Sequence, residues 1–116
     1  MAIVNITCEN DADFIRGFAY QYLDGSPVDL TGNTLRMGIR HHATDAHEDL
    51  LLTTENGGLV ISDAPHGKFT LIILQAQLLR LQTGPYQHSL VRIAPSGPWH
   101  LRIWSGSLVN NPGPSR

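Results

Sequence analysis

The sequence predicts an all-β protein, an antiparallel β-sandwich of about seven or eight strands with one short helical turn. Apolar and polar residues alternate along several short segments, most cleanly where Leu35, Met37 and Ile39 share one face. Turn signals built from glycine, proline and aspartate separate these segments at intervals typical of a sandwich. One segment, 75–82, instead has leucines at helical spacing and predicts the helical turn.

The expected strands follow one another along the chain with recognisable reversals between them. They cover residues 13–23, 35–40, 48–54, 59–61, 68–74, 86–93 and 100–109. Asp24-Gly25 and Gly57-Gly58 mark turns, because glycine accepts a positive φ. Residues 94–98 form a proline- and glycine-rich reversal before the last strand.

The same alternation predicts which side chains form the core. The expected buried residues are Phe14, Phe18, Leu30, Leu35, Met37, Ile39, Phe69, Leu71, Ile73, Leu90, Leu101 and Ile103. His88 and Arg92 interrupt an otherwise apolar face beside Tyr86 and Leu90. Either a β-bulge shifts the register there, or that end of the strand lies at an interface.

The chain length fits one domain. We expect a single sandwich over residues 1–109 of the 116, followed by a flexible tail over 110–116. The sole cysteine, Cys8, excludes an internal disulfide and is expected to be a small buried hydrophobe. No apolar run approaches the roughly 18 residues of a membrane span, and no signal-peptide pattern opens the chain. The sequence therefore predicts a soluble protein made in a cytoplasm.

The content and distribution of charged residues exclude two classes of partner. Only 16% of the residues are charged, against a usual value of about 25%, and the net charge is −2. There is no basic patch for nucleic acid and no lysine-rich segment for an anionic membrane, so we expect neither partner. A weakly charged surface is compatible with many copies packing against neighbours.

The residues that could carry chemistry favour structural roles. His41, His42, Asp45, His47 and Glu48 lie close in sequence, and zinc or nickel binds such side chains. Adjacent strand residues point to opposite faces, however, so we interpret the segment as a solvated loop. No nucleophile motif or phosphate loop is present. We expect no metal, no cofactor and no catalytic residue.

The two tryptophans are the remaining candidates for binding. Trp104 shares its strand parity with Arg102, opposite Leu101 and Ile103, which places it on the outer face of the last strand. A core role for Trp104 is equally compatible with the sequence. We therefore name Trp99, Arg102 and Trp104 as interface candidates, on an exposed edge strand over 100–109 with the loop 94–99 beside it.

One block of the chain carries a family resemblance. The segment 14–18 followed by Asp-Gly-Ser-Pro-Val-Asp-Leu-Thr-Gly at residues 24–32 resembles the immunoglobulin-like modules of tailed-bacteriophage virions. These modules occur in baseplate and tail-fibre adaptor proteins, such as the N-terminal domain of upper baseplate proteins. Weaker pieces continue in the same order to about residue 108. The structural turn motif consists of Asp24, Gly25, Pro27, Asp29, Leu30, Thr31 and Gly32.

Each part of this motif has a physical role in folding. Gly25 and Gly32 permit tight turns, Pro27 stiffens the chain, Leu30 plugs the sandwich end, and Asp29 caps nearby amides. The motif therefore indicates a fold and says nothing about catalysis.

The resemblance implies an immunoglobulin-like fold and a non-enzymatic role in a phage or prophage particle. The expected partners are other virion proteins of the tail baseplate or fibres, with several copies of this chain in the particle. A head decoration or collar protein is the alternative within this class. A carbohydrate-binding module built on Trp99 and Trp104, and a metal-dependent enzyme built on His41 or His42, His47 and Glu48, are alternatives from other classes.

Overall fold

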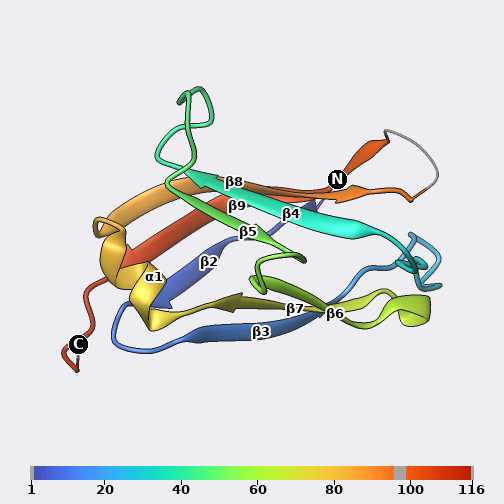
Figure 1. Ribbon diagram of the computed structural model, residues 1–116, viewed down its shortest axis with the longest axis horizontal. Helices are drawn as coiled ribbons and strands as arrows, with labels where there is room; N and C mark the ends of the chain where they lie inside the picture. Colours follow the sequence, from blue (N-terminus) through green and yellow to red (C-terminus); the bar gives the residue numbers. More distant parts are fainter. Residues whose placement is uncertain (1, 96–98, 116) are drawn as a thin grey trace.

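The computed structural model describes residues 2–95 and 99–115, and in this part of the chain two β-sheets pack face to face (Figure 1). In the larger sheet the order is β1 (Ala2–Ile3), β9 (His100–Asn111), β8 (Gly84–Ile93), β4 (Thr34–Arg40) and β5 (Leu50–Thr53), and β2 (Ile6–Glu9) also pairs with β9. The smaller sheet consists of β3 (Phe14–Ala19), β7 (Lys68–Ile73) and β6 (Leu59–Asp63). A 3₁₀ turn, η1 (Ala64–His66), and the helix α1 (Gln75–Arg80) flank β7 in the chain.

This arrangement confirms the all-β sandwich and its short helical turn. The order of strands β3 to β9 within the two sheets can be compared with the order of strands B to G in the immunoglobulin sandwich. The smaller sheet then has the order B-E-D, and the larger sheet has the order G-F-C-C′. The strand expected over residues 68–74 corresponds to β7, which is the central strand of the smaller sheet, between β3 and β6.

The sheets are not wholly antiparallel, because the N-terminal segment runs parallel to β9. Ala2 pairs with Trp104, and Ile6 pairs with Leu108. The sequence pattern predicts no strand over residues 2–9, because two short strands show little alternation of their own. Cys8 on β2 is only 1% exposed, as predicted, and burial raises the pKa of its thiol to about 11. The thiol therefore stays protonated and unreactive at neutral pH.

Aromatic rings join the two sheets in the core. The ring of Phe18 lies 4.6 Å from that of Trp104 and 5.6 Å from that of Phe69, measured between centroids. Most of the predicted core residues are fully buried, and Phe14 and Phe18 pack against the core while partly exposed. The prediction for Leu101 is wrong, because its side chain is 41% exposed.

A β-bulge explains the errors in the last strand. Leu90 pairs with Trp104 and Val91 with Arg102, so Ile103 is an extra residue on β9. An extra residue reverses the strand parity, and both Ile103 and Trp104 are buried as a result. Trp104 is thus a core residue, and its assignment to the outer face was wrong. The bulge does not account for the irregular face of β8, because the extra residue lies on β9 and Tyr86, His88 and Leu90 are buried in regular alternation along β8.

The last strand is also not the exposed edge that was predicted. From Trp104 to Asn111 it lies between β8 and the N-terminal strands. The predicted loose tail is wrong too, since residues 110 and 111 belong to β9 and Asn110 is fully buried. The Gly113 amide then donates a hydrogen bond of 2.8 Å to Asn10 Oδ1. The sandwich therefore extends beyond residue 109.

Candidate functional site

The turn motif has the local structure that its residues predict. Asp29 Oδ1 accepts hydrogen bonds from the amide (2.9 Å) and the hydroxyl (2.6 Å) of Thr31. Asp24 accepts the equivalent pair from Ser26, and in each case the side-chain hydrogen bond is the main cause that lowers the pKa of the carboxyl. Leu30 is completely buried, and its amide donates to the Ala64 carbonyl oxygen at 2.8 Å. The motif therefore has a structural role: it forms two turns stabilised by side-chain hydrogen bonds and places Leu30 in the core.

Gly25 and Gly32 have φ values of 89° and 74°, in the region that favours glycine. These angles agree with the tight turns that the sequence predicts at both positions.

The loop after β4 gathers a different set of metal-ligating residues from the set considered in the sequence. The ligand atoms of His41, Asp45 and Asp49 lie within 4.8 Å of one another. Asp49 Oδ2 already accepts a hydrogen bond from the His41 amide and lies 3.0 Å from His41 Nδ1. Glu48 instead faces Arg36, and His47 is exposed. The convergence of His41 or His42 with His47 and Glu48, which the alternative of a metal-dependent enzyme requires, is therefore not found. The absence of a bound metal stays a prediction.

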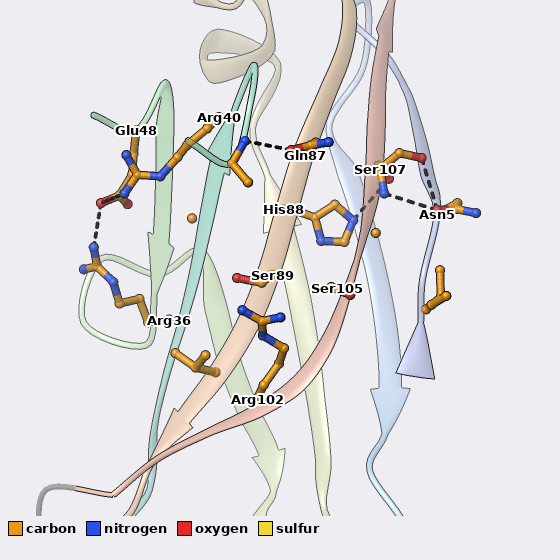
Figure 2. Close-up of a pocket in the computed structure, with 15 residues that line it drawn as sticks. Asn5, Arg36, Arg40, Glu48, Gln87, His88, Ser89, Arg102, Ser105 and Ser107 are labelled. Atoms are coloured by element: carbon orange, nitrogen blue, oxygen red, sulfur yellow. Dashed lines mark hydrogen bonds and ion pairs between the residues drawn. The ribbon is translucent and has the colours of Figure 1, made fainter. Parts of the chain in front are cut away.

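A polar groove of about 650 Å³ lies on the outer face of the larger sheet (Figure 2). Its floor has small side chains because of the strand register. Gly38 of β4 pairs with Ser89 of β8, and Ser89 pairs with Ser105 of β9. Three strands thus place hydrogen atoms or hydroxymethyl groups side by side where larger side chains would fill the groove.

One wall of the groove is an ion-pair network. Glu48 Oε1 accepts a hydrogen bond of 2.6 Å from Arg36 Nη2 and lies 3.5 Å from Arg40 Nη2. Arg40 also donates to the Asp45 carbonyl oxygen at 2.9 Å. These contacts hold two guanidinium groups in fixed positions beside the floor.

Arg102, in the opposite part of the groove, does not belong to this ion-pair network. The Arg102 side chain makes no hydrogen bond or ion pair with any residue of 2–95 or 99–115, and it points along the groove toward Ser89 and Ser105 (Figure 2). Asn5 borders the groove beyond β9, where its Oδ1 accepts from the Ser107 amide and hydroxyl, both at 3.1 Å. The groove therefore presents a free guanidinium beside two hydroxyl groups.

His88 contributes to the same lining from the buried face of β8. It is 5% exposed, and its Nε2 lies 3.1 Å from the Ser107 carbonyl oxygen. Burial lowers the pKa of His88, although the carbonyl oxygens of Ser107 and Val4 oppose that shift. The imidazole is therefore neutral at pH 7 and adds no charge to the groove.

The three interface candidates occupy different environments. Trp99 is 64% exposed but does not line the groove, Arg102 lines it, and Trp104 lies in the core. The loop 94–99 proposed beside them includes residues 96–98, which lie outside the described residues. Arg102 was predicted as an interface residue because it lies on the last strand. The groove itself could not be predicted, because it depends on the register between neighbouring strands.

Comparisons with known proteins add no family assignment. No protein-family model matches this sequence, and no curated protein matches it significantly. Within the described residues, no helix is both long and apolar enough to cross a membrane.

Proposed function

We propose that this chain is a non-enzymatic structural protein of a bacteriophage or prophage virion, placed in the tail baseplate or at the fibre attachment. It acts through contacts with other virion proteins, in several copies per particle. The observation that carries the proposal is the turn motif, whose residues perform the folding roles expected within an immunoglobulin-like strand order.

The outer face of the smaller sheet supports a role in protein contacts. Ile15 on β3 pairs with Ile72 on β7, and Val60 on β6 pairs with Thr70 in the next row of the same face. Ile15 is 64% exposed and Val60 is 44% exposed. Aliphatic side chains aligned across strands make an apolar surface that binding to another protein would remove from water.

The experiment is to purify particles from a host that carries the gene and to quantify the chain in them by mass spectrometry. We expect it in the tail fraction at several copies per particle. Its presence in the cell lysate together with its absence from purified particles would contradict the proposal. Recovery in the head fraction would favour the head decoration or collar alternative.

A pair of variants tests the contact surface. Ile15→Lys places a charge on the aligned face and should lower incorporation at least tenfold without loss of the fold. Leu23→Lys is the matched control, because Leu23 is an exposed aliphatic residue in a turn, away from that face. Equal incorporation of both variants would show that the face is not a contact.

The carbohydrate-binding alternative gains no support from the groove. Aromatic side chains that stack on sugar rings are the usual basis of such sites, and the groove is lined by neither Trp99 nor Trp104. Trp104 is occupied in the core, where it packs against Phe18 and Phe69, and so cannot stack on a sugar.

A further inference from the structure

We infer that the groove on the outer face of the larger sheet is a carboxylate-binding site, occupied by an acidic peptide segment of a partner protein. Arg102 is the principal ligand, and Ser89 and Ser105 are the flanking hydrogen-bond donors. The inference rests on the proposed function in one respect, namely that the partner is a protein.

The first support is the ion pairing of the three arginines that line the groove. Arg36 and Arg40 share Glu48, which leaves their charges partly neutralised. Arg102 has no acidic partner among the described residues, yet it is directed into the groove beside two hydroxyl groups (Figure 2). A guanidinium presents paired N–H donors that match the two oxygens of a carboxylate, and serine hydroxyls add donors at the same anion.

The second support is the distribution of charge over the molecule. Three of the eight Lys and Arg residues line the groove, but only one of the ten Asp and Glu residues does so. The groove is thus a local positive region on a chain whose net charge is −2. An acidic partner is attracted to this face and repelled by most of the remaining surface.

The third support is the shape of the floor. The row of Gly38, Ser89 and Ser105 crosses three strands and leaves room for a ligand backbone. A Cβ atom built on Gly38 would lie 3.3 Å from Glu48 Oε2, so even a methyl group would press on the ion-pair wall. Because the lining lacks Trp, Tyr and Phe, the groove offers hydrogen bonds and charge rather than a stacking platform, which favours a peptide over a sugar acid.

The experiment is an NMR titration of the full chain with the blocked peptide acetyl-Glu-Glu-Glu-amide as the probe. We expect saturable shifts of the backbone amides of Gly38, Ser89 and Ser105, with an affinity that weakens as salt is raised. The corresponding triglutamine peptide has the same shape without charge and should produce no saturable shift.

Variants then assign the binding to individual side chains. Arg102→Gln should weaken the affinity at least tenfold, because it removes a charge-assisted contact. The double change Ser89→Ala and Ser105→Ala should weaken it about fivefold. Arg80→Gln is the matched control, since Arg80 is an exposed arginine on α1 outside the groove. Circular dichroism checks that each variant is folded.

Several results would overturn the inference. These are no shift at the three amides, equal binding by Arg102→Gln and wild type, or equal binding of the two peptides. Tighter binding of methyl glucuronide than of the peptide would replace the protein partner with a sugar acid. Particle incorporation is measured separately, so a chain that enters virions but fails this titration contradicts only the groove assignment.

Discussion

At the residue scale, burial determines what His88 can do. Its ring is 5% exposed, and burial is the main cause that lowers its pKa. Between the folded pKa and the unfolded pKa, His88 is therefore neutral in the folded state and protonated in the unfolded state. As pH falls below the unfolded value of about 6.5, stability should fall until the folded pKa is reached, and it should level off below that point.

The measurement is the free energy of unfolding in urea at several pH values between 7.5 and 5. Linkage limits the effect of one histidine to about 1.4 kcal/mol per pH unit. His88→Gln should remove most of this dependence, while His47→Gln should retain it because His47 is exposed. Parallel curves for wild type and His88→Gln would show that the buried ring does not control the acid response.

Phe69 tests the aromatic cluster. Its side chain is 1% exposed, and its ring contacts those of Phe18 and Trp104. Truncation to alanine should cost about 3–5 kcal/mol of unfolding free energy, because it leaves a cavity between the sheets. Leu101→Ala should cost less than about 1 kcal/mol, since Leu101 is 41% exposed. Similar urea midpoints for the two variants would contradict this account of the core.

Local alternation predicted burial where the strand pairing is regular. Along β4 every second residue faces the core, so Leu35, Met37 and Ile39 were assigned correctly. Alternation failed at Leu101 and Trp104, because the bulge at Ile103 depends on how β9 pairs with β8. No pattern within a single strand contains that information.

At the element scale, the N-terminal segment approaches β9 closely at Gly106. A Cβ atom on Gly106 would overlap the Val4 carbonyl oxygen, which belongs to the link between β1 and β2. Glycine is therefore required there by the close approach of two backbones. The segment 2–9 escaped prediction because its partner strand is about a hundred residues away in the chain.

Gly106→Ala should destabilise the protein by about 1–3 kcal/mol, because the Val4 backbone must move to make room. Gly17→Ala is the matched control. Gly17 also lies in a strand, and a Cβ atom added to it would have the Phe69 carbonyl oxygen as its nearest neighbour, at 4.0 Å. Urea unfolding measures both, and an equal cost for the two changes would show that β1 and β2 are not held as described.

The groove also could not be predicted from the pattern of any single strand. Its floor residues Gly38, Ser89 and Ser105 are distant in sequence, and register alone makes them neighbours. Arg102 could be singled out as a charged residue on a weakly charged strand. Its position beside two hydroxyl groups could not be derived without the pairing of three strands.

At the scale of the whole molecule, the described residues share one core, which runs from Ile6 on β2 to Leu108 on β9. We therefore expect a single cooperative unfolding transition. Fluorescence of the buried Trp104 and far-UV circular dichroism should give the same midpoint in urea. Two separate midpoints would indicate that one sheet unfolds before the other.

The two proposed contact surfaces belong to different sheets. The apolar face lies on the outside of β3, β7 and β6, and the polar groove lies on the outside of the larger sheet. A sandwich with one surface on each outer face can hold two neighbours at once. This geometry suits the proposed role in contacts with other proteins.

The parallel pairing of the N-terminal strands with β9 also has a mechanical consequence. Residue 2 lies level with Trp104, within β9, whereas the C-terminus lies beyond the last residue of that strand, at the left end of the sandwich in Figure 1. A pulling force applied between them runs along β2 and β9 in opposite directions. The hydrogen bonds between these two strands are then loaded together in shear, rather than peeled apart one after another. We therefore expect these hydrogen bonds to resist such a force before the two sheets separate.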